Sequence, residues 1–463
     1  MPLLTRRTLL QALMVQALPS GSADTRATVH RTPTPLAPGA VTHDWASFLG
    51  PSHNGVSTET PLNKNLPPPL VWELPKGTGY ASPAIAGDHL VFIHRFEDEE
   101  VVDCLDAETG ERRWQFRYDT DFEDRYGYSN GPRASPVIDG GRVFTVGAEG
   151  KLYCLDLETG EEVWKQDFWR KYGVAPDPFG TASTPLVEGG LLIVNVGGPR
   201  RACVVGLDDE TGREAWRAGR WGPGYASPVP ATIHGERRVF VFAGGPSNPP
   251  TGGLLCIDPV TGDVDFEMDH RGRAIESAHA SCPVVFDDKV FISASYRTGG
   301  VLVEVQPDFD HRVVWNTPDF GLHFNTPIHR GGYLYGFDGR NQGDASLACL
   351  ETATGQVVWR EAPTWTETFD MNGRRQRLGV GTARGSLLAV EERFLCLGEF
   401  GHLLWLDLTP EGHTELARTW LFAARESWTL PVLSRGLLYV TQNTRDFITG
   451  VAPRLLCYDL RGN

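Results

Sequence analysis

The chain has 463 residues and a net charge of −15, with 41% hydrophobic and 22% charged residues. The negative charge argues against the basic face that nucleic acid or anionic lipid requires, and the apolar content is enough for a buried core. The 52 glycines and 33 prolines, against 4 methionines, favour turns and strands over long helices. The composition therefore predicts an all-β globular protein that does not bind nucleic acid.

Residues 1–23 are typical of an export signal. Arg6 and Arg7 precede a short apolar stretch from Leu9 to Leu18, and small residues follow it. A paired arginine in this place indicates a twin-arginine-like signal, the alternative being a chance pair at a cytosolic N-terminus. No segment reaches the roughly 20 apolar residues that cross a bilayer. We therefore expect an exported protein, periplasmic or extracellular, with no transmembrane segment after signal removal.

Residues 24–44 are rich in Thr and Pro, with Pro33, Pro35 and Pro38 at nearly regular intervals. Such a composition suits a spacer, so we predict a linker here and the folded domain at 45–463.

An internal repeat covers most of this domain. Asp106 leads through Thr109-Gly110 to Trp114, and Asp156 leads through Thr159-Gly160 to Trp164. The same pattern recurs at Thr211-Gly212, Thr261-Gly262 and Thr354-Gly355. Asp and Gly close a turn between two strands, and the large aromatic residue that follows is expected to pack between neighbouring units.

A second anchor, a small residue followed by Pro, begins each unit. It occurs at Ser82-Pro83, Ser135-Pro136, Thr184-Pro185, Ser227-Pro228, Cys282-Pro283 and Thr326-Pro327, with Leu430-Pro431 as the last copy and a degenerate copy at Ser386. These eight anchors are spaced by about 50 residues, as in a propeller with four strands per blade.

The two ends of the domain are complementary. The last unit, from Pro431 to Asp459, ends before a tryptophan strand, and Trp72 lies in an isolated strand near the start. Joining them removes open sheet edges. We predict one eight-bladed β-propeller of four-stranded antiparallel blades, closed by an N-terminal strand in the C-terminal blade. Seven blades is the alternative, if the stretch from Val380 to Trp420 forms no full blade.

These motifs, together with the opening Trp45-Ala46-Ser47-Phe48-Leu49-Gly50-Pro51, resemble the PQQ-like propeller repeat family. The resemblance covers almost the whole predicted domain and implies a β-propeller. The family contains dehydrogenases that use pyrroloquinoline quinone (PQQ) and non-catalytic proteins similar to the outer-membrane assembly factor BamB. The repeat encodes the packing of the blades, so it indicates the fold and does not indicate the function.

The eight cysteines are expected to be free and buried. Five of them occupy the same position of the repeat, in different blades and too far apart to bridge: Cys104, Cys154, Cys256, Cys349 and Cys457. PQQ dehydrogenases usually carry two adjacent cysteines over the cofactor, but this sequence has neither a Cys-Cys pair nor a Cys-x-x-Cys-His. We therefore expect no cofactor, with PQQ and calcium as the alternative.

Residues just before the anchors should meet at one mouth of the central channel, because the first strand of each blade lines it. The residues there that the repeat does not require are Asn130, Arg133, Glu276, His279, His323, Asn325, Arg384 and Trp428. Arginine suits a ligand carboxylate, Glu with Asn suits a hard cation, and His279 beside Glu276 is the best candidate for a general base. The alternative is that these groups only hydrate or fill the channel, and we predict no dedicated metal site.

These observations favour a binding or scaffold module similar to BamB. The first alternative is a PQQ-dependent oxidoreductase with its cofactor at the channel mouth. The second is a protein that binds carbohydrate or an envelope polymer. The partners we expect are envelope proteins or a small ligand.

Overall fold

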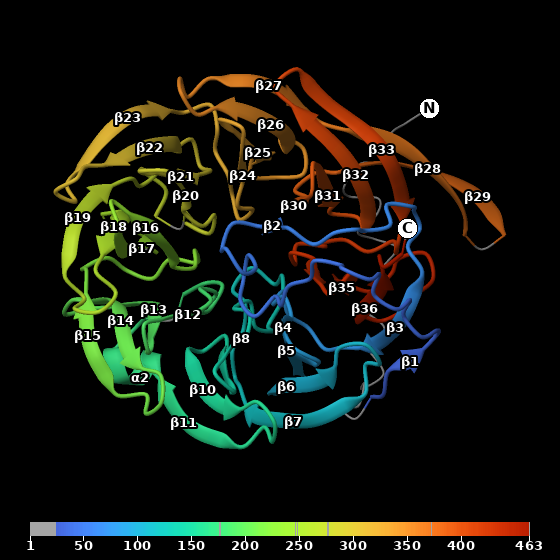
Figure 1. Cartoon of the computed structure of the whole chain (residues 1–463), viewed down its shortest axis with the longest axis horizontal. Helices are drawn as coiled ribbons and strands as arrows, with labels where there is room; N and C mark the ends of the chain where they lie inside the picture. The colour runs from blue at the N-terminus through green and yellow to red at the C-terminus, as the bar shows by residue number, and fades with distance from the viewer. Residues whose placement is uncertain are drawn as a thin grey trace.

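Eight four-stranded antiparallel sheets form a closed ring around a central channel (Figure 1). The computed structural model describes residues 25–462 apart from Pro176, Pro246, Asn248, Glu276 and Asn372. The predicted export signal therefore lies outside the described residues. The ring confirms the prediction of an all-β, eight-bladed propeller.

Each of the first three blades consists of four consecutive strands, running from the channel outwards. They are β4 (Ala84–Ala86), β5 (His89–Phe96), β6 (Glu99–Asp106) and β7 (Arg112–Asp119); β8 (Val137–Asp139), β9 (Arg142–Val146), β10 (Lys151–Asp156) and β11 (Glu162–Asp167); and β12 (Leu186–Glu188), β13 (Leu191–Gly198), β14 (Ala202–Asp208) and β15 (Glu214–Ala218). A short helix, α2 (Phe168–Tyr172), follows the second blade.

The fourth to sixth blades repeat this arrangement. They are β16 (Val229–Ile233), β17 (Glu236–Ala243), β18 (Gly253–Ile257) and β19 (Val264–Asp269); β20 (Val284–Phe286), β21 (Lys289–Ala294), β22 (Gly299–Val305) and β23 (His311–Thr317); and β24 (Ile328–Arg330), β25 (Tyr333–Asp338), β26 (Ser346–Glu351) and β27 (Val357–Glu361).

The seventh blade is complete, so the alternative of seven blades is wrong. Its strands are β30 (Ser386–Val390), β31 (Arg393–Leu397), β32 (His402–Thr409) and β33 (Gly412–Trp420), and β2 (Val56–Ser57) pairs in parallel with β30. Between the sixth and seventh blades the chain forms an extra hairpin, β28 (Thr364–Met371) with β29 (Arg374–Gly381), which projects beyond the ring in Figure 1.

The eighth blade is shared by the two ends of the domain, as predicted. Strands β34 (Val432–Ser434), β35 (Leu437–Gln442) and β36 (Arg454–Asp459) come from the C-terminal end, and β3 (Leu70–Pro75) pairs antiparallel with β36. Figure 1 shows the blue β3 beside the red β36. The ring therefore has no open edge between its last and first blades.

The predicted linker contacts this blade along part of its length. Strand β1 (Thr28–Val29) pairs with β3, and the backbone N–H of Thr34 donates to Asp459 at 2.7 Å. The assignment of residues 24–44 as a spacer stays a prediction.

The aromatic residue of each motif lies at the seam between blades. The Trp114 indole Nε1 donates to the Leu157 carbonyl of the next blade at 2.7 Å, and Trp164 donates in the same way to Asp209 at 2.9 Å. The turn glycine of the next blade lies against the ring: a Cβ on Gly160 would lie 2.5 Å from Trp114. The tryptophans therefore join the blades, as predicted.

The small residue of each anchor also joins neighbouring blades. The Ser82 N–H donates to the Ser135 hydroxyl at 3.1 Å, and the Ser135 N–H donates to Thr184 at 2.9 Å. The series continues through Ser227 to the sulfur of Cys282. A short side chain that accepts a hydrogen bond fits here, because the innermost strands of neighbouring blades lie in contact.

The segment before β3 crosses one end of the channel. Trp45 forms a β-bridge to Ile85 in the first blade, and the Ala46 carbonyl accepts from Ile138 in the second. Leu49 packs in the core between the fourth and fifth blades before β2 reaches the seventh. One end of the channel is therefore covered by backbone and apolar side chains.

Candidate functional site

A cavity of about 420 Å³ lies at the mouth of the channel, above the small anchor residues. The residue two positions before each small anchor residue lines it in every blade. These eight residues are Tyr80, Arg133, Ala182, Tyr225, Ala280, Phe324, Arg384 and Trp428. The two alanines leave room, and the six larger side chains form the wall.

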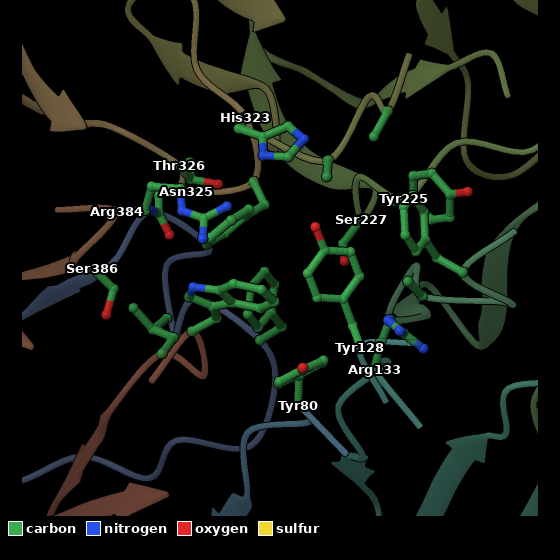
Figure 2. Close-up of a pocket in the computed structure, with 18 of the residues that line it drawn as sticks. Tyr80, Tyr128, Arg133, Tyr225, Ser227, His323, Asn325, Thr326, Arg384 and Ser386 are labelled. Carbon is green, nitrogen blue, oxygen red and sulfur yellow. The ribbon is translucent and has the colours of Figure 1, made fainter. Parts of the chain in front are cut away.

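Aromatic rings form most of that wall. Trp428 lies 5.2 Å from Tyr80 and 5.4 Å from Phe324, measured between ring centroids. Tyr128, from the loop between the first and second blades, makes an edge contact with Trp428 at 5.5 Å. Figure 2 shows Tyr128 in the middle of the group, with Tyr225 and His323 around it. The cavity is thus bordered by flat, rigid side chains.

Three arginines line the cavity, and they differ in whether a carboxylate neutralises the guanidinium charge. Arg133 is paired with the buried Asp124, and Arg384 with Glu399. The Arg340 guanidinium lies over the Tyr296 ring, 4.3 Å from its centroid. It has no hydrogen bond or ion pair with any residue that the structure describes. A net positive charge therefore remains at the rim, at Arg340.

Glu399 holds two cavity residues in place. Its fully buried carboxylate accepts hydrogen bonds from the Trp428 indole at 2.9 Å and from the Arg384 backbone N–H at 3.2 Å, besides its ion pair with the guanidinium. Gln342 donates to the same carboxylate at 3.1 Å. Glu399 thus fixes both the ring of Trp428 and the charge of Arg384, and the cavity is largely preformed.

His323 lies in the wall as a neutral imidazole. Its Nε2 is 3.2 Å from the Tyr296 hydroxyl. Burial, reinforced by the charges of Arg384 and Arg340, lowers its pKa to about 3. His323 is therefore suited to hydrogen bonding and is a weak base.

Most of the predicted mouth residues come together. Five line the cavity, from the starts of four blades: Arg133, His323, Asn325, Arg384 and Trp428. Asn130 does not; its side chain accepts from the Asp124 N–H at 2.9 Å and shapes the loop. Glu276 lies outside the described residues.

His279, the predicted base, does not reach the cavity. Its ring is fully buried and stacks on Phe242 at 4.1 Å, and its Nδ1 lies 3.0 Å from the Ala243 carbonyl. Its neighbours Ala278 and Ala280 line the cavity instead. Burial lowers the His279 pKa well below its usual value. We therefore do not assign it a catalytic role.

Most of the aromatic wall was not predicted from the sequence. Three of these residues precede their anchors by the same two positions as Arg133 and Arg384: Tyr80, Tyr225 and Phe324. They could therefore have been predicted from that spacing. Tyr128, Phe179 and Tyr296 come from loops outside the repeat and carry no such signal.

The described residues only partly fit PQQ with calcium. The rings and guanidinium groups suit a flat anionic group, but within the described ranges no cluster of three or more His, Cys, Asp or Glu residues could hold a metal. The nearby carboxylates are engaged elsewhere, Asp124 with Arg133 and Glu399 with Arg384. The described residues thus suit a flat anion but supply it with no calcium site, and we derive no redox step from them.

Comparison with known proteins agrees with the fold. Residues 98–361, more than half of the chain, match the family model described as "Outer membrane protein assembly factor BamB". A quinohemoprotein alcohol dehydrogenase, ADH-IIG from Pseudomonas putida, is 29% identical over 188 residues, which is 38% of this chain and only 22% of that enzyme.

Two solved structures share the architecture at low identity. BamB from Moraxella catarrhalis superposes with a TM-score of 0.52 and 14% identity, over 83% of this chain and 95% of that one. A europium-containing methanol dehydrogenase gives a TM-score of 0.63 and 12% identity, over 90% and 98%. With its eight blades and its match across the repeats, the chain belongs to the PQQ-like propeller family that the BamB model describes.

Proposed function

We propose that this protein is a ligand-binding propeller that holds a small anionic ligand with a flat body at the channel mouth. The observation that carries this proposal is the cavity bordered by aromatic rings, with the unpaired guanidinium of Arg340 at its rim. Aromatic rings contribute a large contact area at low conformational cost, and a guanidinium binds a carboxylate with two parallel hydrogen bonds.

The electrostatics favour one anionic group on the ligand. Arg133 and Arg384 are neutralised by Asp124 and Glu399, so Arg340 is the group that gains a partner on binding. An aromatic wall around such a charge excludes water and strengthens the contact.

Binding is favoured over catalysis by the state of the ionisable groups. His323 is neutral and a weak base. Glu426 accepts a hydrogen bond from the Tyr80 hydroxyl at 2.6 Å, and burial raises its pKa. His323 is too weak a base to remove a proton from a ligand, and Glu426 does not line this cavity and is held by Tyr80.

Export to the periplasm or beyond is part of the same proposal. The paired arginines at Arg6 and Arg7 support it, and within the described residues no helix has the length and apolarity to cross a bilayer. The protein can also have an envelope protein as a partner, as the name of BamB suggests for that relative. The cavity occupies only one mouth of the ring, so it leaves other surfaces for such a partner.

Isothermal titration calorimetry with small carboxylates tests the proposal. Benzoate and D-galacturonate, each paired with its uncharged amide, serve as probes. We expect a carboxylate to bind, and Arg340→Gln or Trp428→Leu to weaken it by about tenfold or more. Arg312→Gln, on the outer strand β23, is the matched control and should leave binding unchanged. No binding by the unaltered protein, or equal binding by all variants, would overturn the proposal.

The second candidate is a PQQ-dependent oxidoreductase, and the similarity to ADH-IIG favours it. Incubation with PQQ and Ca²⁺, followed by desalting and an absorbance spectrum, distinguishes the two. Quinone retained in a calcium-dependent way supports the enzyme, whereas retention without calcium dependence places PQQ among the flat anions that the cavity binds.

A further inference from the structure

A second, larger cavity adjoins the first. Its volume is about 1190 Å³, and it shares four lining residues with the first cavity: Tyr128, Asn341, Arg384 and Trp428. The two cavities therefore adjoin at these four residues.

The extra hairpin forms one side of the second cavity. Thr364 pairs with Gly381 and Thr366 with Gly379, so these four residues lie on one face of β28 and β29. All four line the cavity. A Cβ on Gly379 would meet no atom within 4 Å, so bare backbone borders open space there. Glycine within a strand is typical of sites where a ligand approaches the backbone.

The lining of the second cavity is suited to hydroxyl groups. Thr364 and Thr366 supply hydroxyls, and Asn341 and Gln342 supply amides, all of which can both donate and accept hydrogen bonds. The ring of Trp428 continues from the first cavity. A ligand built of flat units with hydroxyl groups at their edges can stack on the Trp428 ring and hydrogen-bond to the hydroxyl and amide side chains.

Each cavity also has one guanidinium without a carboxylate partner among the described residues. Arg340 lines the first and Arg425 lines the second, and neither makes a side-chain hydrogen bond or ion pair within the described part of the chain. The carboxylates of the second cavity are engaged, Glu399 with Arg384 and Glu426 with Tyr80. One free guanidinium per cavity matches a chain with one carboxylate per unit.

We propose that the two cavities are consecutive subsites for an acidic oligosaccharide, with its first sugar in the aromatic cavity and the next units beneath the hairpin. The inference rests on the proposed function, because the first cavity is its anchor. A single-stranded nucleic acid also has flat, charged units, but the grooves that bind such strands are lined with many basic residues, and each of these cavities offers only one guanidinium that is not already ion-paired among the described residues. An acidic peptide matches the charge and lacks the flat units that the rings would contact.

Calorimetric titration with oligogalacturonates of one to four units tests the inference. The affinity should rise at least about tenfold from the monomer to the trimer. Gly379→Leu, which fills the open space without a positive φ, and Arg425→Gln should each abolish that rise and leave monomer binding unchanged. Thr368→Leu, on the same strand face but outside the cavity, is the matched control. Thermal melting of each variant identifies any loss of folding, and Gly379→Ala is the milder replacement.

The outcomes separate the two proposals. If the monomer does not bind, the proposed function fails in its saccharide form. If the monomer binds but the trimer binds no better, or Gly379→Leu keeps the rise, the second subsite is refuted. Stronger binding of tetraglutamate or of oligo(dT) than of the trimer would overturn the saccharide assignment in favour of a peptide or a nucleic acid.

Discussion

The turn glycines of the repeat carry two constraints at once. Gly160 has a φ of 72° and a Cβ there would lie 2.5 Å from the Trp114 ring. Gly189, in a turn between β12 and β13, has a similar φ of 61° but would meet no atom within 4 Å. Comparing the two positions therefore separates the cost of a left-handed backbone from the cost of crowding the indole ring.

Gly160→Ala should destabilise the protein by about 3 kcal/mol, and Gly189→Ala by about 1 kcal/mol. The left-handed backbone costs an alanine about 1 kcal/mol, and crowding the indole adds about 1–3 kcal/mol. Urea unfolding followed by circular dichroism measures both. Equal effects would show that the glycine is required for its φ alone.

The cysteine position of the repeat has a packing reason that the sequence did not reveal. Cys104 pairs across the strands with Trp114, Cys154 with Trp164 and Cys349 with Trp359. In the third blade the equivalent residue is Gly206, opposite Trp216. The position takes a small side chain because an indole lies across from it.

Asp177, behind the cavity residue Tyr225, should make stability depend on pH. Burial raises its pKa to about 7, while the charges of Arg125 and Arg271 act in the opposite direction. The folded state therefore holds a proton that the unfolded chain releases near pH 4. The contribution is fully present below pH 4 and is lost as pH rises to 7.

Asp177→Asn should remove this dependence, with a stability gain of up to about 4 kcal/mol at pH 8 and little change at pH 4. Denaturant midpoints across this range test it, with Asp319→Asn on the exposed surface as the control. A gain of the same size at both pH values would contradict the assignment.

At the scale of elements, closure depends on β3. It pairs with β36, and the Trp72 indole donates to the Ala107 carbonyl of the first blade at 3.0 Å. The strand thus completes one blade and joins it to the next.

A chain that begins at Lys76 should lose cooperative unfolding and aggregate, because the edge of β36 is exposed. A synthetic peptide of residues 64–76, added in trans, should restore part of the stability, and the same peptide with Trp72→Ala should not. Normal melting of the truncated chain would refute the closing role of β3.

The hairpin β28–β29 stands outside the blade pattern. Its inner face packs on the seventh blade, where Trp365 makes an edge contact with His402 at 4.9 Å and Phe369 with Trp420 at 5.9 Å. It therefore has a fixed position although it belongs to no blade, and this lets it border the second cavity.

At the scale of the whole molecule, all eight cysteines are free and buried. Burial raises the pKa of Cys203, for example, to about 12, which keeps it a thiol at neutral pH. A thiol reagent at pH 8 should therefore label fewer than about one cysteine in the native protein. In guanidinium chloride, without reductant, it should label all eight. Labelling of only six or fewer after unfolding would indicate a disulfide.

The eight-bladed ring could be predicted from the repeat alone. The Thr-Gly turn, the seam tryptophan and the small residue of the anchor act on neighbours in the chain or in the next blade, so each copy specifies its own blade. Their spacing gives the count of eight, and the isolated strand at Trp72 predicts the closure. These features could be predicted because their interactions are the same in every repeat.

The candidate site, in contrast, depends on contacts between distant parts of the chain. Ring closure brings Arg133, His323 and Arg384 together, as expected from their position before the anchors. Whether a given side chain faces the channel also depends on the local direction of the backbone. His279, for example, points into the core and stacks on Phe242. Tyr128 and Arg340 come from loops that follow no repeat. The second cavity arises where an insertion packs on a distant blade, a contact between residues far apart in the chain that no local pattern encodes.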